Sequence, residues 1–549
     1  MRHIRVLLGV VLLVMGAPTQ AARVHGPQVR PAITPRLSAP VALLPTAPMA
    51  AGLPREMPAR RGTPAAVAER SAPPVPHSRA AADAARSVPA PLQNFEGLGK
   101  DGAVPPDTIG DVGPNHYVQM VNSGPNGANF AVYNKSGVKL AGPTALGQLW
   151  LSAGVTNACT QYGSGDPVVV YDQLAQRWLL SQFAFETSVS PPWYIAIAVS
   201  ASSDPLGAYY VYCFEETDYF PDYPKFGVWP DGYYMTSNDS DGLVGAWAFE
   251  RAKMLLGQPA RVLKFEVDGN FLLPADCDGS TAPPANAPNY LYTMMDDTYW
   301  PSQGFPGPDR YEIWAYQVDW VTTNNSSVTM VAALPCAPFN YTVNGYFNWN
   351  AIPQKNTTMK VDAVSEWPMW RAQYRNFGGY QTLVGNFTVD ADGADHAGIR
   401  WFELRRTLTN NWSIYQENTF VPDENHRWMG SLAMNGNGEM ALGYSVSGSN
   451  LFPGIRYTGR VAADALGTLD SETSIWDGFA SQTTSARWGD YSAMSVDPVD
   501  DATFWYTQEY IGSNGIWRTR ITTLTVVPEP QWCMLALALA PLVRRRTAL

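Results

Sequence analysis

The sequence has few charged residues and lacks the motifs that mark the commonest enzyme classes. Asp, Glu, Lys and Arg make up only 15% of its 549 residues. It contains no Gly-x-Ser-x-Gly nucleophile elbow, no His-Glu-x-x-His zinc helix, no Walker A loop and no Cys-x-x-Cys pair. The sequence therefore gives no support for an α/β-hydrolase, a zinc protease, a P-loop nucleotidase or a dithiol oxidoreductase.

Histidine and basic charge are also scarce. Only His116, His396 and His426 lie within residues 93–526, so we expect no histidine-rich metal site. The sequence gives no support for a Ser-His-Asp triad and leaves it open. The net charge is −11 and the pI is near 5.1, which argues against a nucleic-acid-binding protein because such a protein needs a basic face.

Turn-forming and aromatic residues are abundant. The chain has 46 Gly, 45 Pro, 19 Trp and 27 Tyr residues. Glycine and proline favour turns, and aromatic side chains favour pleated strands with cross-strand pairs. The composition therefore predicts an all-β protein with many turns.

Both ends of the chain carry the pattern of processing segments. Arg2 and Arg5 precede an apolar run over 6–15, and small residues follow near Ala21, so residues 1–22 are predicted to be a signal peptide. Residues 23–92 are rich in Ala, Pro, Arg and Val and nearly lack aromatics. Such a segment buries too little apolar surface to offset its ordering entropy, so we predict a disordered spacer.

Residues 527–549 combine a polar tetrad, an apolar stretch and a basic cluster. The tetrad is Val-Pro-Glu-Pro, and the apolar stretch over 531–543 is shorter than the roughly 20 residues that span a bilayer. This tail resembles the PEP-CTERM signal that exosortases of Gram-negative bacteria process. The resemblance implies cleavage by an exosortase, transient membrane association through the tail, and a mature protein at the cell surface or outside the cell. The sorting residues are Pro528, Glu529, Pro530, Arg544, Arg545 and Arg546.

Cysteine usage fits an oxidising compartment. Of the five cysteines, Cys533 lies in the tail, which leaves Cys159, Cys213, Cys277 and Cys336. Four cysteines allow three pairings. We favour Cys159–Cys213 and Cys277–Cys336, because each pair brackets one structural unit; four free thiols are the alternative.

A strand–turn–strand pattern recurs along residues 93–526. It appears at 111–122, 166–183, 223–238, 290–295, 380–387, 427–445 and 487–506. Seven units of about 60 residues exceed the 40–50 residues of compact propeller repeats, but surface loops can hold the excess. We predict a β-propeller of seven blades, with six or eight blades or a two-domain β-sandwich as alternatives.

Several of these units resemble those of sialidase-like (BNR-type) propellers. The similar phrases are 166–172 with Trp178, and 488–492 with 495–498 and 504–505. Ser495 and Asp497 fit the Asp-box of that family, but its glycine is missing. The resemblance implies the propeller fold more than sialidase chemistry.

Charged residues at the predicted strand starts are candidates for a binding site at the channel mouth. Several arginines facing one pocket could grip a carboxylate of an acidic sugar. The alternative is that they pair with aspartates as struts between blades. The ligand-binding candidates are Asp111, Asp166, Lys225, Arg371, Arg427 and Arg487, and the catalytic candidates are Tyr223, Glu366, Asp490 and Tyr491.

Asp390, Asp392 and Asp395 lie on one glycine-containing loop and could offer oxygen ligands to Ca²⁺; a solvated turn is the alternative.

Two functions remain open at this point. The protein either binds glycan or exopolymer without catalysis, contributing to an extracellular matrix, or it is a glycan-active hydrolase or lyase.

Overall fold

The computed structural model describes residues 24–47, 55–56, 77–78, 87–239, 242–269, 271–346, 348 and 350–527. The predicted signal peptide (1–22) and the sorting residues 528–549 lie outside the described residues. Among the described helices, none is long and apolar enough to cross a membrane.

Strands dominate the described chain, and successive strands pair antiparallel in groups of four. Two neighbouring groups are also joined by a parallel strand pair into one larger sheet. We number seven such groups as units I to VII. Unit I contains β7 (Ile109–Val112), β8 (His116–Ser123), β9 (Gly127–Asn134) and β10 (Lys139–Ala145), and unit II contains β11 (Gly165–Asp172), β12 (Arg177–Ala184), β13 (Trp193–Ser200) and β14 (Tyr209–Glu216). Unit III contains β15 (Asp222–Trp229), β16 (Gly232–Asp239), β17 (Leu243–Phe249) and β18 (Ala260–Asp268).

The remaining units follow the same order. Unit IV contains β19 (Leu273–Asp278), β20 (Asn289–Met295), β21 (Arg310–Gln317) and β22 (Ser327–Pro335), and unit V contains β23 (Pro368–Asn376), β24 (Gln381–Asp390), β25 (Ala397–Arg406) and β26 (Ser413–Phe420). Unit VI contains β27 (His426–Met434), β28 (Met440–Gly448), β29 (Leu451–Arg460) and β30 (Thr473–Trp476). Unit VII contains β31 (Ala493–Val496), β32 (Phe504–Ile511), β33 (Trp517–Leu524) and, from the other end of the chain, β5 (Gln93–Gly99).

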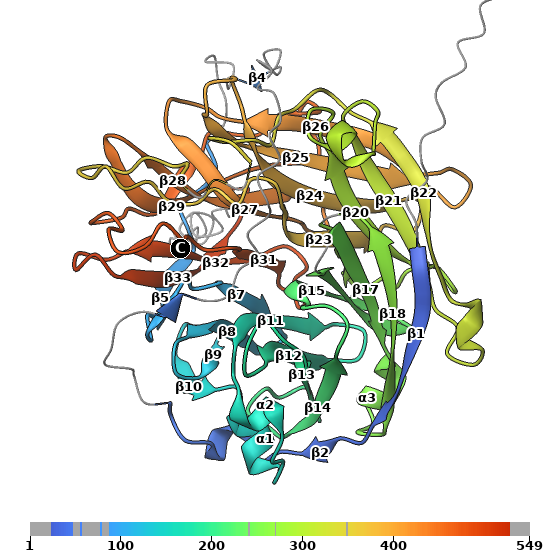
Figure 1. Ribbon diagram of the computed structural model, residues 1–549. Coiled ribbons are helices and arrows are strands. Elements are labelled where there is room, and N and C mark those ends of the chain that lie inside the picture. The colour runs from blue at the N-terminus through green and yellow to red at the C-terminus, as the bar shows by residue number, and fades with distance from the viewer. Residues whose placement is uncertain are drawn as a thin grey trace, which may run out of the picture.

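The units stand side by side around a common centre, with the first strand of each unit innermost (Figure 1). Inner strands such as β11 and β15 are buried at every position, whereas most residues of the outer strands β10 and β22 are exposed or half-buried. This gradient is expected where sheets pack face to face near an axis and meet solvent at the rim. The predicted all-β class is therefore confirmed.

Side chains of one inner strand bond the backbone of the next, which lines up neighbouring units. Tyr171 N–H donates to Asp111 Oδ2 at 2.7 Å, joining units II and I. Val228 N–H donates to Asp276 Oδ1 at 2.9 Å, joining units III and IV. Met434 N–H donates to Gln373 Oε1 at 2.6 Å, joining units VI and V. These bonds satisfy inner-strand donors that have no partner in their own sheet.

The prediction of a disordered spacer over residues 23–92 is wrong for residues 24–47. β1 (Val24–Ile33) pairs antiparallel with β18, β2 (Arg36–Leu37) pairs with β14, and the 3-10 helix η1 (Val41–Leu43) follows. In Figure 1 this blue segment runs along the outer rim of units III and II. The compositional argument considered only apolar burial, whereas an outer strand also offers unpaired backbone groups to any extended segment.

Further short elements occupy the loops and the rim. The strands are β3 (Arg55–Glu56), which pairs with β6 (Ala103–Val104), and β4 (His77–Ser78), which pairs with β26. The helices are α1 (Gln148–Ser152), α2 (Ala158–Gln161), α3 (Arg251–Met254), η3 (Trp300–Gln303) and η4 (Thr323–Asn325).

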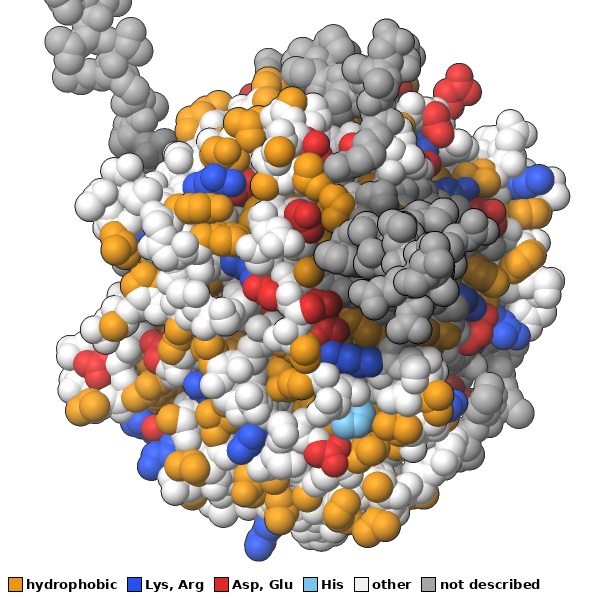
Figure 2. Space-filling view, turned by 180° about the vertical axis from the view of Figure 1, so that it is seen from behind, with side chains coloured by type: hydrophobic (Ala, Val, Ile, Leu, Met, Phe, Trp, Pro, Cys, Tyr) orange, Lys and Arg blue, Asp and Glu red, His pale blue; other side chains and the backbone are white. Residues whose placement is uncertain are grey.

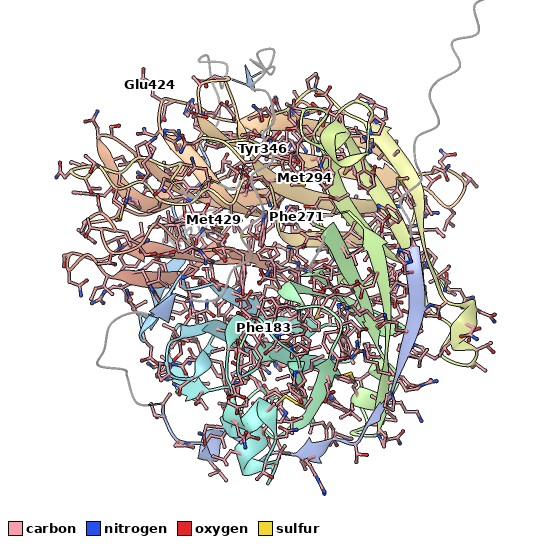
Figure 3. All side chains as sticks on the ribbon, viewed as in Figure 1. Phe183, Phe271, Met294, Tyr346, Glu424 and Met429 are labelled. Atoms are coloured by element: carbon pink, nitrogen blue, oxygen red, sulfur yellow. A yellow bond between two sulfur atoms is a disulfide. The ribbon has the colours of Figure 1, made fainter. Side chains whose placement is uncertain are left out.

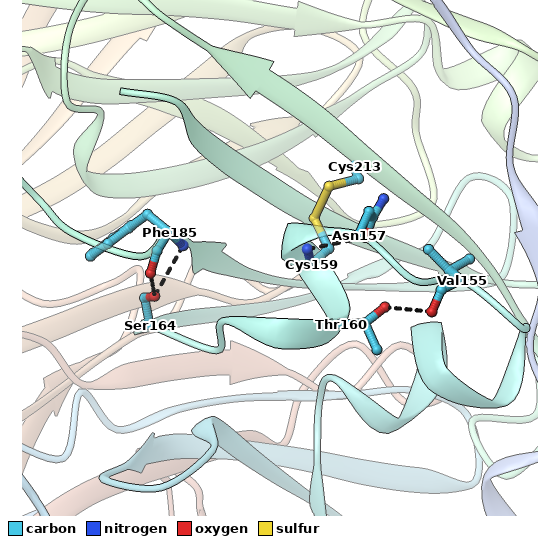
Figure 4. Close-up of a disulfide and its surroundings, with 7 residues drawn as sticks. All are labelled: Val155, Asn157, Cys159, Thr160, Ser164, Phe185 and Cys213. Carbon is cyan, nitrogen blue, oxygen red and sulfur yellow. Dashed lines mark hydrogen bonds between the residues drawn. A yellow bond between two sulfur atoms is a disulfide. The ribbon is translucent and has the colours of Figure 1, made fainter. Parts of the chain in front are cut away.

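The predicted disulfide Cys159–Cys213 is confirmed, and it ties α2 to the outer strand β14 (Figure 4). Asn157 caps α2, because its side chain accepts the N–H of Cys159 at 3.1 Å. The predicted pair Cys277–Cys336 is wrong, since both are free cysteines. Cys277 lies on the inner strand β19, whereas Cys336 follows the outer strand β22 of the same unit. Three strand spacings, or about 14 Å, separate these strands, which is too far for a disulfide.

Candidate functional site

Six of the seven described units place a residue with positive φ at or near the start of their inner strand. L-residues rarely adopt this conformation, so its repetition marks an equivalent position in each unit. These residues are Asp107, Asp166, Tyr223, Phe271, Met429 and Asp490, with φ between 47° and 59°. Phe271 and Met429 lie near the middle of the molecule in Figure 3. Units VII, I and II thus present an aspartate at this position, and unit III presents a tyrosine.

Lys225 lies at the centre of this cluster, fully buried between two aromatic rings. Its Nζ lies 3.4 Å from the ring centroid of Tyr223 and 3.8 Å from that of Tyr491, and it donates to Pro224 O at 3.2 Å. Lys225 forms no ion pair with any described residue. Burial lowers the pKa of Lys225 to about 8, against the raising effect of carboxylates nearby, first among them Asp166.

The carboxylates around Lys225 differ in how they are satisfied. Asp490 Oδ2 pairs with Arg487, while its Oδ1 has no hydrogen-bond partner among the described residues. Both oxygens of Asp107 also lack a described partner, although the residue is 1% exposed. Burial, together with the charges of Asp490 and Asp166, raises the pKa of Asp107 well above its usual value. We call Asp107, Asp166, Lys225, Arg487 and Asp490 the axial cluster. It contains buried charge that the described residues around it do not fully satisfy.

The segment 336–367 covers this cluster. Asp362 N–H donates to Ala486 O at 2.8 Å, and Trp367 packs edge-on against Tyr223 at 4.2 Å between ring centroids. As a result Tyr223, Tyr491, Glu366 and Asp490 are all at most 8% exposed. The two phenols donate to backbone carbonyls, Tyr223 to Asp490 O at 3.2 Å and Tyr491 to Pro167 O at 2.8 Å. Burial raises the pKa of both phenols, so neither is an ionised nucleophile at neutral pH.

The four catalytic candidates are thus brought only partly together. Tyr223, Asp490 and Tyr491 lie in contact with the axial cluster. Glu366 lies on the covering segment, where its charge acts on Asp362, Tyr341 and Tyr346.

The three arginines do not converge on one anion pocket, so, of the two interpretations that the sequence left open, their contacts do not support the shared carboxylate-binding site. Arg371 is 2% exposed and pairs with Asp276 and Asp278. Arg427 is fully buried and pairs with Asp423 and Glu472, and Arg487 pairs with Asp490. Each guanidinium is held by a different set of carboxylates. Only Arg371 joins two units, which is the strut arrangement that the sequence left open.

Asp111 belongs to the Arg371 set rather than to the axial cluster. Both of its oxygens accept backbone N–H groups, those of Val112 and Tyr171, at 2.7 Å. Burial raises the pKa of Asp111 to about 6, although Arg371 opposes the shift. Sequence reasoning named Asp111 and missed Asp107, four residues earlier. The sequence contained a signal that could have identified Asp107, because it precedes its inner strand β7 as Asp490 precedes β31.

The loop carrying Asp390, Asp392 and Asp395 is built as a turn. Asp390 Oδ1 accepts the N–H groups of Gly393 and His396 at 3.0 and 3.2 Å. Asp392 contacts His396, and Asp395 accepts the N–H of Asn344 at 2.7 Å. These three carboxylates therefore point to different partners and not to one calcium ion.

A different trio brings its carboxylate oxygens within 4.8 Å of one another in the described chain: Asp296, Asp297 and Asp309. The sequence analysis did not identify it. The oxygens of Asp296 accept the N–H groups of Thr298 and Tyr341, and those of Asp309 accept the N–H groups of Asp297 and Phe339. Four backbone bonds therefore already satisfy the two buried members.

An open cleft of about 840 Å³ lies where units V and VI meet, and sequence reasoning did not find it. The turn between β24 and β25 supplies Asp392, Ala394 and His396. The chain from the end of β26 into β27 supplies Val421, Pro422, Asp423, Glu424, Asn425 and His426. Glu424 is exposed and projects from the edge of the molecule in Figure 3.

His396 links the two walls of this cleft. Its Nδ1 lies 3.2 Å from Asp392 Oδ2 and its Nε2 lies 3.1 Å from Asn425 O. Its ring packs edge-on against that of His426 at 5.2 Å. Arg427 lies beneath the cleft and holds Asp423; although burial opposes it, this contact lowers the pKa of Asp423 to about 2. The cleft is therefore lined by three carboxylates, two imidazole rings and a side-chain amide.

Neither a protein-family model nor a curated protein sequence matches this chain. Solved structures with partial likeness include an exo-β-1,3-galactanase from Clostridium thermocellum, at 11% identity with a TM-score of 0.29, covering 80% of this chain and 100% of that one. A GH43 β-1,3-galactosidase matches at 9% identity with a TM-score of 0.27, covering 81% and 96%. The SapL1 lectin in complex with α-methyl fucoside matches at 8% identity with a TM-score of 0.32, covering 67% and 96%.

Proposed function

We propose that this protein is a closed seven-bladed β-propeller at the cell surface or outside the cell, where it binds glycan or exopolymer. Each of the units I to VII supplies one blade. The pairing of β5 with β33 joins the start of the propeller to its end, as expected for a ring closed by strands from both ends of the chain. The disulfide Cys159–Cys213 supports an oxidising compartment.

The observation that carries the binding function is the open cleft between units V and VI. It is large enough for a saccharide unit, and its polar groups come from two walls that His396 holds together. Carboxylates and imidazoles can accept and donate hydrogen bonds to sugar hydroxyls. The axial cluster, by contrast, is covered by the segment 336–367.

The charge of the cleft favours a neutral sugar or an amino sugar over an acidic one. Asp392, Asp423 and Glu424 line it, and Arg427 is already paired with carboxylates. On the face seen in Figure 2, acidic and basic side chains are interspersed over the visible described residues, with no basic patch. A uronate or sialic acid would therefore meet repulsion in the cleft.

A glycan-binding screen followed by calorimetry tests this proposal. We expect binding of neutral or amino-sugar oligosaccharides and none of uronate oligomers. Asp392→Gln and Glu424→Gln should each weaken binding about tenfold with little change in melting temperature, because both residues are exposed. Glu186 is exposed and lies in unit II, far in the sequence from the residues that line the cleft, so Glu186→Gln is the matched control. Binding that the cleft variants leave unchanged would contradict the proposal.

The second candidate is a glycan-active enzyme that uses the axial cluster. It is favoured by the convergence of Asp107, Asp490 and the two tyrosines at one place. A screen against fluorogenic glycosides and acidic polysaccharides tests it. Turnover that Asp490→Asn abolishes would support the enzyme and count against a purely binding function.

The sorting proposal rests on the resemblance of residues 527–549 to the PEP-CTERM signal. Exosortase cleavage should remove the apolar stretch and Arg544–Arg546 from the mature protein. Intact-mass measurement of protein released from the cell surface should find no residues beyond about Pro530. Released protein that retains its full C-terminus would overturn this proposal.

A further inference from the structure

The axial cluster has more buried negative charge than the described residues around it compensate. Asp107, Asp166 and Asp490 lie close enough to Lys225 and Arg487 for their charges to act on one another, and Asp222 and Asp362 adjoin the same group. All of these side chains are at most 8% exposed. Among the described residues, five buried carboxylates therefore face two cations.

Buried charge left uncompensated costs several kcal/mol, so each surplus carboxylate needs either a proton or a counter-ion. Arg487 neutralises Asp490, which leaves Asp107 and Asp166 to Lys225. Lys225 pairs with neither, because its ammonium lies against the rings of Tyr223 and Tyr491. The charge of Asp107 therefore has no direct partner among the described residues.

A second observation points to a bound group at the same place. Both oxygens of Asp107 and Oδ1 of Asp490 lack hydrogen-bond partners among the described residues. Native structures leave few such groups, and a bound ion is one of the ordinary explanations. Carboxylate oxygens are the ligands that hard divalent cations take, and these two neighbouring carboxylates have three oxygens without a described partner.

We propose that Asp107 and Asp490 hold a divalent cation of the calcium type at the axis, with Asp166 beside it. The three carboxylates occupy the same positive-φ position in units I, VII and II, which are neighbours through the β5–β33 pairing and the contacts of β31 with β7. The ion would join the first and last parts of the ring. The site is distinct from the cleft, so its existence does not depend on glycan binding.

Terbium provides a direct probe, because Tb³⁺ replaces Ca²⁺ and its luminescence is excited through nearby tyrosines. The full chain, purified without chelator, should contain one calcium per molecule by elemental analysis. Tb³⁺ should displace it with emission sensitised by tyrosine, and EDTA should lower the melting temperature of the protein. A wild-type protein that holds no ion and gives no sensitised emission would show that the carboxylates carry protons instead.

Two substitutions locate the ion. Asp107→Asn should raise the apparent Kd for Tb³⁺ at least tenfold, whereas Asp297→Asn, in the other carboxylate trio, should leave it unchanged. Loss of binding in Asp297→Asn, with normal binding in Asp107→Asn, would overturn the proposal.

Lys225→Met keeps the proposal testable if Asp107→Asn does not fold. Removing a positive charge beside the site should tighten Tb³⁺ binding severalfold, and unchanged or weaker binding would contradict it.

Discussion

Two lysines in this protein are fully buried, and their surroundings differ in one respect. Lys264 Nζ contacts Asp239, Glu266 and Glu216 at 2.6, 2.7 and 2.8 Å. Lys225 Nζ contacts two tyrosine rings and one carbonyl, and its nearest carboxylates form no ion pair with it. Burial alone would lower the pKa of both groups. The carboxylates that touch Lys264 reverse the effect and raise its pKa, whereas the pKa of Lys225 falls to about 8.

The comparison shows that direct contact with carboxylates distinguishes a structural ion-pair network, that of Lys264, from a candidate functional site, that of Lys225. Around Lys264 the carboxylates have a common cation, and the arrangement joins the outer part of unit II to unit III. Around Lys225 the carboxylates and the ammonium are neighbours without being partners. Charge left in this state is typical of functional or ligand-binding positions.

The largest expected effect is that of Lys264→Met. It leaves Asp239, Glu216 and Glu266 buried without their common cation, which should lower the free energy of unfolding by about 3–5 kcal/mol. Urea denaturation at neutral pH measures the loss. Lys253→Met, at an exposed lysine, is the control and should change stability by less than about 0.5 kcal/mol. A loss below about 1 kcal/mol for Lys264→Met would show that the contacts are not what stabilises this region.

A smaller loss of stability is expected from Gly245→Ala. This substitution tests whether the contact between Lys264 and Asp239 needs the space beside Gly245. Gly245 lies on β17, between the strands that carry Asp239 and Lys264. A Cβ there would lie 2.6 Å from Ser237 Oγ and 2.9 Å from Asp239 Oδ2. Overpacking of this kind costs about 1–3 kcal/mol. Thermal denaturation should show the loss in the wild-type background and a smaller one in Lys264→Met, because the two residues share partners.

The inner and outer parts of the molecule also differ in how well the sequence predicts them. The hairpins over 166–183 and 223–238 could be predicted, because runs of strand-forming residues flank a Pro-Asp-Gly turn in the second and a short polar turn in the first. The disulfide Cys159–Cys213 could be predicted from spacing and compartment. These features depend on residues that are near one another in the sequence.

The axial cluster and the cleft could not be predicted in this way, because each combines residues from more than one unit. Asp107 and Asp490 belong to units that lie side by side but come from opposite ends of the sequence, and the cleft joins two turns on either side of β25 and β26. The idea of a shared arginine pocket also depended on several units, and it did not hold because equivalent positions in repeats need not have equivalent partners. Arg371 meets two aspartates of unit IV, whereas Arg487 meets Asp490 within its own unit.

Lys225→Met should cost less at neutral pH than Lys264→Met, about 1–2 kcal/mol, because it removes mainly the cation–π contacts of a desolvated ammonium. Its signature is the pH dependence. The pKa of Lys225 is about 8 in the folded protein and about 10.4 in an unfolded chain, so the unfolded state holds more protons between these values. Stability of the wild type relative to Lys225→Met should therefore rise with pH over this window.

Lys264 should show the opposite slope, because its pKa is raised on folding. Its contribution is fully present below the unfolded pKa of about 10.4 and is lost as pH rises beyond that value. Denaturation curves of the three proteins between pH 7 and pH 11 would measure both slopes. Parallel pH dependences for the two variants would contradict the difference in contacts from which the comparison starts.

The smallest effect is expected from Tyr491→Phe. The substitution removes the hydroxyl that donates to Pro167 O at 2.8 Å but keeps the ring beneath Lys225. One neutral hydrogen bond contributes about 1 kcal/mol, and the carbonyl that loses its partner adds to the cost. Because the ring faces Lys225 through its π-system and not through the hydroxyl, the alkaline pH dependence should keep the wild-type slope. Tyr491→Leu, which removes the ring, is the matched variant and should change that slope. If Tyr491→Phe alone abolished the pH dependence, the hydroxyl and not the ring would set the environment of Lys225, and the contrast with Lys264 would have to be explained by hydrogen bonding.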